Sequence, residues 1–297
     1  MTTVSKGLTA GALAFAIWGI FPLYFHPLRQ ISAFQVIAHR VIWSCVFVLV
    51  WTAMRGELST LRATLVNRSV IWRLAVTATL ITISWVVFVW AVMNGHVVES
   101  SLGYFINPLV NVLLGVALLS ERLTRAQWTA VALAATGVAY LTIVTGSPPW
   151  IALTLAFTFG IYGLIRKVAK VESLPGLATE TLLLLPFAVA YLLWCESAGT
   201  GALGHARPAI AALLIGSGPL TAIALYLFAY GARLLPYSTV GVLQYITPTL
   251  QLACGVFAFH ERFERTRAIG FALIWAALLL YAGEGLWLSR KQPRALA

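Results

Sequence analysis

The chain has 297 residues, of which 60% are hydrophobic and 10% are charged, and its formal net charge is +11. A soluble domain carries roughly 25% charged residues, so this composition excludes an ordinary soluble protein and indicates an integral membrane protein. The basic residues are scattered among short loops rather than gathered on one folded face, which excludes nucleic acid as a partner.

Apolar runs long enough to cross a bilayer recur along the whole chain. A transmembrane helix needs about 20 apolar residues to cross a hydrocarbon core of roughly 30 Å. The first run follows a start that carries only Lys6, and no small-residue cleavage site follows it, so we expect an uncleaved first helix. We expect ten spans, at 8–28, 33–54, 72–93, 98–119, 127–145, 149–167, 176–195, 209–231, 237–258 and 268–288.

The basic residues predict which face is cytoplasmic. If the N-terminus is inside, the segments on its side hold fourteen of the twenty Lys and Arg residues. Positive loops stay on the cytoplasmic side of a membrane, so we expect both termini to be cytoplasmic. The fourteen are Lys6, Arg55, Arg62, Arg68, Arg73, Arg122, Arg125, Arg166, Lys167, Lys170, Arg233, Arg290, Lys291 and Arg294.

The two halves of the chain end in the same pattern. Residues 101–125 and 241–265 align without a gap, and each segment carries a proline (Pro108 or Pro248), a glycine seven residues later and a Glu-Arg pair. Each half, 1–145 and 146–297, holds five spans, and because five is odd the halves must cross the membrane in opposite directions. Inverted repeats of this kind are typical of secondary transporters, with the site near midplane. The two prolines predict broken helices that act as hinges.

Several segments resemble a known family. AHRVIWS at 38–44, ESSLGYFINPLVNVLLG at 99–115 and the ERL that follows resemble the RarD branch of the EamA family, in the drug/metabolite transporter superfamily. The resemblance covers essentially the whole chain and implies a ten-helix, all-α transporter of the inner membrane. It implies that the first four helices of each half surround a central cavity and that the fifth packs outside. Family substrates are diverse metabolites and drugs, and RarD proteins are associated by name with chloramphenicol sensitivity.

We therefore expect a permease that exports a small metabolite or drug-like amphipathic solute by alternating access. A flippase for a lipid or lipid-linked substrate is the alternative, and it requires a cavity that opens sideways to lipid. The chain has no HExxH motif, paired aspartates or serine-nucleophile signature, and Cys45, Cys195 and Cys254 have no metal-ligand spacing. We expect that the protein is not an enzyme and that it binds no cofactor or metal. The expected partners are the substrate and the bilayer, and the expected state is a monomer or weak homodimer.

Arg40 is the residue that is most costly to place in a membrane. It lies seven residues inside the second span, roughly 10 Å below the surface at 1.5 Å per residue, where insertion of an arginine costs up to about 2.5–3.5 kcal/mol. It either binds a substrate anion or a gating acid, or it snorkels outward. Glu99 is either a helix-start acid favoured by the helix dipole, or the partner of Arg40. Glu180, assigned as the repeat counterpart of His39, either takes up a proton, which would couple transport to protons, or caps its helix.

Polar side chains on the fourth span of each half share one face, and the two faces match through the repeat. Polar groups are costly in lipid and tolerated along a cavity, so we expect this polar stripe to line the cavity, with interhelical hydrogen bonds as the alternative. The stripe consists of Tyr104, Asn107 and Asn111 in the first half and Gln244, Thr247 and Gln251 in the second.

Aromatic residues in the spans are the candidates for an apolar, stacking lining, although each is also a candidate for ordinary packing or for the interface belt. They are Trp18, Trp43, Trp85, Trp90, Tyr162, Tyr226, Tyr230 and Tyr245. At the end of each half, the pairs Glu121-Arg122 and Glu261-Arg262 are expected to form turn-stabilising ion pairs, or else to tether adjacent helices.

Overall fold

The structure is a computed structural model that describes residues 3–119, 123–169, 171–202, 207–235, 240 and 243–291. The first half forms α1 (Thr3–Phe25), a 3-10 turn η1 (His26–Leu28), α2 (Ala33–Met54), α3 (Leu58–Val66), α4 (Arg68–Met93), α5 (Val97–Leu119) and α6 (Arg125–Thr145). The second half forms α7 (Trp150–Ala169), α8 (Ser173–Ser197), α10 (Pro208–Leu234), α12 (Ile246–Ala253), a π-helical turn η2 (Cys254–Ala258) and α13 (Arg265–Lys291).

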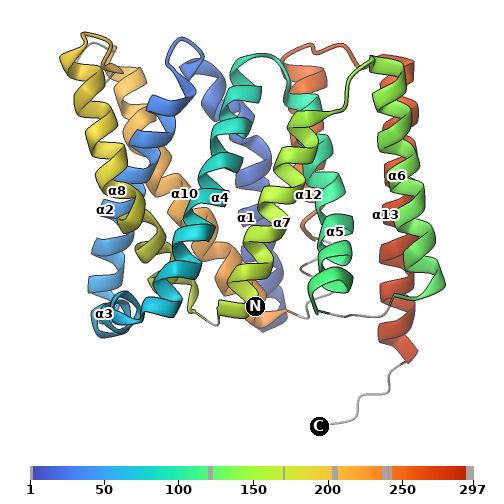
Figure 1. The fold of residues 1–297 in the computed structure, drawn as a ribbon, viewed down its shortest axis with the longest axis horizontal. Helices are drawn as coiled ribbons and strands as arrows, with labels where there is room; N and C mark the ends of the chain where they lie inside the picture. The colour runs from blue at the N-terminus through green and yellow to red at the C-terminus, as the bar shows by residue number, and fades with distance from the viewer. Residues whose placement is uncertain are drawn as a thin grey trace.

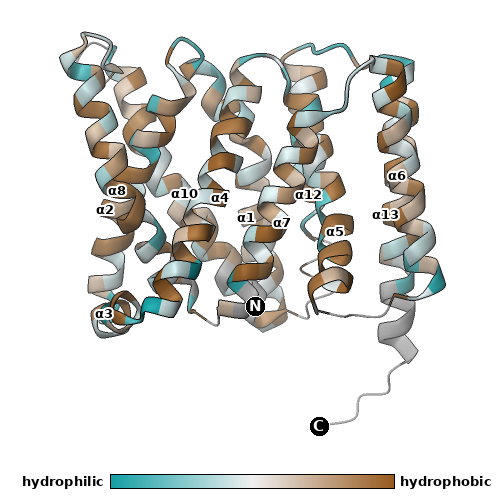
Figure 2. Cartoon of the chain, viewed as in Figure 1, coloured by the Kyte–Doolittle hydropathy of each residue, from teal (hydrophilic) through white to brown (hydrophobic). Residues whose placement is uncertain are grey.

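The helices have the length and composition of membrane spans. Over the described residues, eight are long and apolar enough to cross a membrane, and two shorter apolar helices, Trp150–Arg166 and Ile246–Ala258, bring the number to ten. Hydrophobic residues cover their middles, and hydrophilic residues gather toward the two ends of the bundle (Figure 2). The predicted all-α membrane fold is confirmed. The start of the ninth predicted span, at 237–239 and 241–242, lies outside the described residues.

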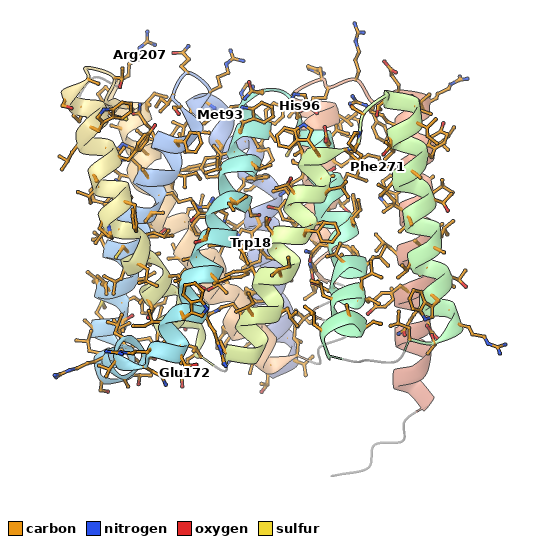
Figure 3. All side chains as sticks on the ribbon, in the orientation of Figure 1. Trp18, Met93, His96, Glu172, Arg207 and Phe271 are labelled. Atoms are coloured by element: carbon orange, nitrogen blue, oxygen red, sulfur yellow. The ribbon has the colours of Figure 1, made fainter. Side chains whose placement is uncertain are left out.

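The two halves cross the bundle in opposite directions. Met93, at the end of α4, and Arg207, just before its counterpart α10, lie on the same face, which also holds His96 (Figure 3). We call this the His96 face, and we call the opposite face, where Glu172 precedes α8, the Glu172 face. The start of α1 and the end of α13 are both at the Glu172 face (Figure 1). The described helices therefore form two inverted five-helix repeats.

The contacts between helices occur in equivalent pairs that this inversion relates to each other. The first helix of each half packs against the third of the other half, α1 with α10 and α7 with α4. It also packs against the fourth helix of the other half, so that α1 contacts α12 and α7 contacts α5. The fifth helices, α6 and α13, pack against each other at one side of the bundle, at the right in Figure 1. The halves are thus interleaved, and the first four helices of each build the centre.

The ends of the helices follow from local capping. Asn67 accepts the N–H of Val70 at the start of α4, and Thr124 forms a capping box with Gln127 at the start of α6. Gly146 ends α6 with φ of 73°, a left-handed conformation that glycine adopts without a steric cost. The short helix α3, at the Glu172 face, was missed by the sequence analysis because nine residues are too few to read as a span.

The prediction of two matching broken helices is wrong for the first copy. Helix α5 runs without interruption through Pro108. In the second copy the helix is interrupted at Gln244 and Tyr245, and α12 restarts at Ile246, so that Pro248 is in its first turn. Proline is tolerated in a first turn because an N–H there has no intrahelical partner.

Candidate functional site: two buried charged positions

Arg40 is held inside the bundle, in the half nearer the His96 face. Its residue is 3% exposed, and its Nε donates to Thr221 Oγ1 of α10 over 2.9 Å. The guanidinium carbon lies 4.1 Å from the ring centre of Trp85, 5.4 Å from that of Phe21 and 5.6 Å from that of Phe25. A cation over an aromatic face is stabilised by roughly 0.5–2 kcal/mol. The alternative that Arg40 snorkels outward does not fit, because the side chain stays within the bundle.

The Arg40 guanidinium is incompletely bonded. Its Nη1 is fully buried and has no hydrogen-bond partner among the described residues. Glu99, the acid that could pair with it, is engaged elsewhere, because its Oε1 accepts the N–H of Ile151 in the first turn of α7 over 3.1 Å. The pairing of Glu99 with Arg40 is therefore wrong, and the helix-start interpretation fits, because Glu99 lies in the first turn of α5 and also binds the start of α7. We call Arg40, Thr221, Trp85, Phe21 and Phe25 the Arg40 site.

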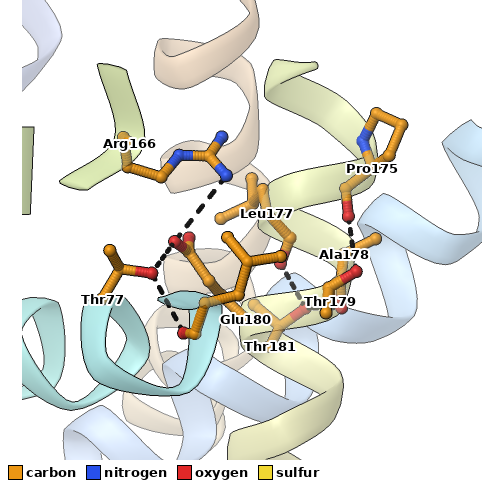
Figure 4. Close-up of polar contacts among 9 residues, drawn as sticks. Thr77, Arg166, Pro175, Leu177, Ala178, Thr179, Glu180 and Thr181 are labelled. Atoms are coloured by element: carbon orange, nitrogen blue, oxygen red, sulfur yellow. Dashed lines mark hydrogen bonds and ion pairs between the residues drawn. The ribbon is translucent and has the colours of Figure 1, made fainter. Parts of the chain in front are cut away.

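Glu180 forms the corresponding charged position near the Glu172 face. It is 2% exposed, and its Oε1 accepts a hydrogen bond from Thr77 Oγ1 of α4 over 2.7 Å (Figure 4). Arg166 of α7 lies 3.8 Å from the same oxygen through its Nη1, and the Tyr162 hydroxyl interacts with both charged groups. We call these four residues the Glu180 site. The carboxylate therefore has a cation and two hydroxyls as partners.

A glycine makes room for this ion pair. A Cβ on Gly176, one helical turn before Glu180 on α8, would come within 2 Å of the Arg166 guanidinium, at 1.9 Å from Nη1. The guanidinium therefore lies directly against the α8 backbone. Glu180 does not cap the start of α8, since its carboxylate is taken up by side chains of α4 and α7.

The structure corrects the assignment of Glu180 as the counterpart of His39. Continuous buried segments cover residues 35–41 in α2 and 175–181 in α8, and they begin two positions after the first residue of each helix. This alignment makes Glu180 the repeat equivalent of Arg40. The two residues lie at the same depth, each measured from its own face of the bundle. The repeat thus carries opposite charges at equivalent positions.

The polar stripe forms the interhelical hydrogen bonds that were its alternative. Asn107 is fully buried and its Nδ2 donates to the Ala156 carbonyl of α7 over 3.0 Å. Its repeat equivalent, Thr247, donates from Oγ1 to the Phe15 carbonyl of α1 over 2.8 Å. The two bonds correspond across the inversion and tie the fourth helix of each half to the first helix of the other. The cavity-lining prediction is therefore wrong for Asn107 in this structure.

The second position of the stripe differs between the halves. Gln251 is 1% exposed, and its Nε2 donates to the Trp18 carbonyl over 3.2 Å, while its Oε1 is buried without a partner. Asn111, its equivalent in α5, is exposed and bonds to Asn107 within its own helix. Gln244 is half-buried in the turn before α12. Equivalent positions of the repeat are therefore exposed in the first half, at Asn111, and buried in the second half, at Gln251.

The sequence and the fold agree with a known transporter family. The model of the EamA-like transporter family matches residues 5–143 and 148–283. The chain belongs to this family. It is 44% identical to the uncharacterized transporter YojE of Bacillus subtilis over 93% of each chain. It is also 40% identical to Protein RarD of Escherichia coli, covering 97% of this chain and 98% of the relative.

Two further likenesses extend the comparison. A Pseudomonas aeruginosa relative named chloramphenicol-sensitive protein RarD is 33% identical over 99% of each chain. A crystal structure of a protein with 21% identity superposes with a TM-score of 0.60 and covers 93% of this chain and 96% of the other, which shows a shared fold. This EamA-family member is thus a multi-pass membrane transporter of RarD type and not an enzyme.

The expected aromatic lining is divided among several places in this transporter. Trp85 lies under Arg40, and Tyr104, a member of the polar stripe, packs between Phe88 and Phe159 near the centre. Trp18 packs against Phe15 and Phe228 at mid-height (Figure 3). Trp43 has a buried Nε1 without a partner. Tyr245 is half-buried beside the cluster that joins α5 to α13.

Three of the expected lining residues lie away from the centre. Trp90 is 36% exposed and stacks on His96, at the His96 face. Tyr226 and Tyr230 instead line a surface groove of about 320 Å³ between α1 and α10, together with Lys6. A central lining is therefore wrong for these three in this structure.

Glu261 joins the two halves at the His96 face. Its carboxylate accepts the N–H of Val97 over 2.6 Å and that of Val98 over 2.9 Å, at the start of α5. It tethers the segment after α12 to α5, so the second of its two interpretations fits the structure, and the predicted ion pair with Arg262 is wrong. The equivalent residues Glu121 and Arg122 lie outside the described residues.

Sequence reasoning missed the partners of the two charged positions. Arg166 was counted only as a topology-setting charge, and Thr77 and Thr221 were ordinary polar residues within long spans. One signal was available. The separation of 140 residues that aligns the fourth spans also makes Glu180 the equivalent of Arg40.

Proposed function

We propose that this RarD-type protein is a secondary transporter of the cytoplasmic membrane that exports a small metabolite or drug-like amphipathic solute by alternating access. The observation that carries the proposal is the pair of equivalent bonds, Asn107 to Ala156 and Thr247 to Phe15, that interleave two inverted repeats. Each bond joins helices from different halves. A rocking movement of one half against the other would change both ends of the centre at once.

Unequal packing at the two ends supports this mechanism. Among the described residues, the largest buried hydrophobic cluster includes Phe25, Leu28, Val97 and Ile151, from segments that turn at the His96 face. It closes the centre there. Toward the opposite face, Asn111 is exposed although its equivalent Gln251 is buried. Repeat-equivalent positions in different surroundings are what alternating access requires, because each half takes up the arrangement of the other in the opposite state.

The orientation of the bundle is part of the proposal. The segments at the Glu172 face include α3 and the starts of α4 and α6, which carry Arg62, Arg68 and Arg125. Positive segments remain cytoplasmic, so the Glu172 face would be the inner one and both termini would be inside. The structure would then be closed to the outside. Proton coupling through Glu180 and a monomeric or weakly dimeric state remain predictions.

A flippase is the second candidate, and one observation favours it. The groove between α1 and α10 is lined by apolar side chains and by Tyr226 and Tyr230, and exposed Lys6 is at its rim. Leu13, which also lines it, is 50% exposed. A groove on the outer surface of a membrane bundle faces lipid, so it offers an amphipathic lipid a place beside the bundle.

Reconstitution into liposomes separates the two candidates. Purified protein is placed in vesicles, and the uptake of a panel of radiolabelled organic anions, cations and neutral solutes is measured against protein-free vesicles. Saturable counterflow of at least one solute supports the transporter. Bleaching of a fluorescent phospholipid in the inner leaflet by external dithionite, without solute flux, supports the flippase. Absence of both activities in correctly folded protein contradicts both candidates.

A further inference from the structure

The Arg40 and Glu180 sites are built from equivalent helices of the two halves. The bonds from Thr247 to Phe15 and from Asn107 to Ala156 fix how α1 aligns with α7. Counted from Phe15 and Ala156, Phe21 corresponds to Tyr162 and Phe25 corresponds to Arg166. The helices that surround Arg40 are therefore the counterparts of those that surround Glu180. The threonines come from the third helices in both sites, Thr221 from α10 and Thr77 from α4, although they lie one helical turn apart in the repeat alignment.

The two sites differ in their charge balance. Glu180 has its counter-ion inside the protein, because Arg166 lies 3.8 Å from the carboxylate. At the Arg40 site the position of Arg166 is taken by Phe25, an aromatic ring without charge. No described carboxylate lies within 4 Å of an Arg40 nitrogen, and Glu99 is held by Ile151. One site is neutral by itself, and the other lacks its anion.

A buried charge without a counter-ion is costly, and the cost points to a role. Buried charges in proteins are paired or hydrogen-bonded because their transfer from water is strongly unfavourable. Thr221 and the aromatic faces offset part of that cost for Arg40, but Nη1 remains buried with no partner in the described part of the chain. An ionisable residue inside a membrane protein with an unmet bonding need is a functional candidate.

We infer that Arg40 binds the carboxylate of an organic anion whose apolar or aromatic body packs against Trp85, Phe21 and Phe25. The inference rests on the proposed transport function and names the class of solute. A guanidinium binds a carboxylate through parallel N–H bonds, and Thr221 fixes the plane of the guanidinium through Nε. The three aromatic rings supply the apolar wall.

The site is occluded in this structure, and its packing shows how it opens. Gly218 of α10 lies against the backbone of α2, since a Cβ there would be 2.3 Å from the carbonyl carbon of Trp43. Thr221 is three residues further along α10. Separation of α10 from α2 would release the bond to Arg40 and expose its guanidinium. The anion therefore enters or leaves in the state that is open toward the His96 face.

Binding to the purified full-length protein tests the inference. The probes are benzoate, phenylacetate and indole-3-acetate, each compared with its neutral amide, and binding is measured by isothermal titration in detergent. We expect saturable binding of at least one carboxylate and at least 30-fold weaker binding of its amide. Arg40→Gln should weaken carboxylate binding at least 30-fold, and Arg40→Lys should weaken it less, because an ammonium keeps the charge and loses the fork geometry.

Arg29→Gln is the matched control, because it removes one positive charge from the turn before α2 without touching the site. It should bind the carboxylates as the parent does. The inference is overturned if no carboxylate of the panel binds saturably, or if Arg40→Gln and Arg40→Lys bind as the parent does. Liposome flux of cations or neutral solutes with no carboxylate binding would leave the transport function standing and remove the anion. Carboxylate binding with no flux would keep the site and remove the transporter.

Discussion

The Arg40 and Glu180 sites occupy equivalent places in the two inverted halves, yet they are built from different chemistry. Around Glu180 the protein supplies a complete set of partners in Arg166, Tyr162 and Thr77. Around Arg40 it supplies one hydroxyl and three aromatic rings. The repeat has kept equivalent helices around the two positions, whereas the partners and the charge balance have diverged. The Glu180 site is therefore a lock between helices, whereas the Arg40 site has an open bonding position.

A second difference between the halves lies in helix spacing. Gly218 of α10 corresponds to Ala78 of α4 through the repeat. The glycine allows the α10 backbone to reach that of α2, while Ala78 is a buried alanine in α4. Small residues at helix crossings set how closely membrane helices approach. The close approach of α10 to α2 beside the Arg40 site therefore depends on a glycine whose repeat equivalent is alanine.

The largest expected effect comes from removing one member of the Glu180 pair. Glu180→Gln leaves the Arg166 charge without its counter-ion, and breaking a buried pair costs about 3–5 kcal/mol of unfolding free energy. Reversible unfolding in mixed micelles measures this loss. The matched change Arg40→Gln should cost less than about 1 kcal/mol, because it breaks no ion pair. Equal losses in the two variants would contradict the comparison.

The double variant Glu180→Gln with Arg166→Gln sharpens the same comparison. Both charges are then gone, so most of the stability lost in the single variant should return. If the double variant is less stable than Glu180→Gln alone, Arg166 is held by other partners and the lock is not this pair.

The next effect concerns helix spacing. Gly218→Ala places a methyl group 2.3 Å from the α2 backbone, and forced overpacking costs about 1–3 kcal/mol. The reverse change at the equivalent position, Ala78→Gly, should cost about 1 kcal/mol through helix propensity alone. Cysteine cross-linking between α2 and α10 should fall in the Gly218→Ala variant. Unchanged stability and cross-linking would show that α10 is not closely packed there.

The sequence predicts the features that depend on a single segment or on the repeat, but not the contacts that depend on how distant helices pack. The ten spans and the inversion follow from apolar runs and from one ungapped alignment. The buried Arg40 was singled out because a charge in a span is rare and costly. Its partners were not predictable, since Thr221 and Phe25 are ordinary residues in a membrane helix. Depth alone makes Glu99 a candidate partner of Arg40. Only the packing of α7 against α5 shows that Glu99 instead accepts the N–H of Ile151.

A smaller effect is expected at the tether between the halves. Glu261→Gln removes the charge and one of the two acceptors that bind the N–H groups of Val97 and Val98. Loss of a capping acid costs about 1 kcal/mol. Glu264→Gln is the matched control, because that side chain is exposed in the same loop. If both variants lose the same stability, Glu261 does not act as a cap.

The smallest effects are expected for the equivalent bonds of the polar stripe. Asn107→Ala and Thr247→Ala each remove one interhelical hydrogen bond, which costs on average about 0.6 kcal/mol in membrane proteins. The two losses should agree within about 0.5 kcal/mol if the bonds are equivalent. Thr249→Ala is the control, because Thr249 donates to Tyr245 within its own segment. A loss in only one of the two variants would show that the halves are not joined in the same way.

The most direct test of the account transplants the missing anion into the Arg40 site. Phe25 holds the place that Arg166 holds beside Glu180, so Phe25→Glu should give Arg40 an internal counter-ion. A double-mutant cycle with Arg40→Gln, read by unfolding in mixed micelles, should show favourable coupling of about 2 kcal/mol, and Phe25→Gln in the same cycle should show little coupling. The Phe25→Glu variant should also lose carboxylate binding. A coupling near zero, with Phe25→Glu equally damaging whether or not Arg40 is present, would contradict the claim that Arg40 lacks an anion.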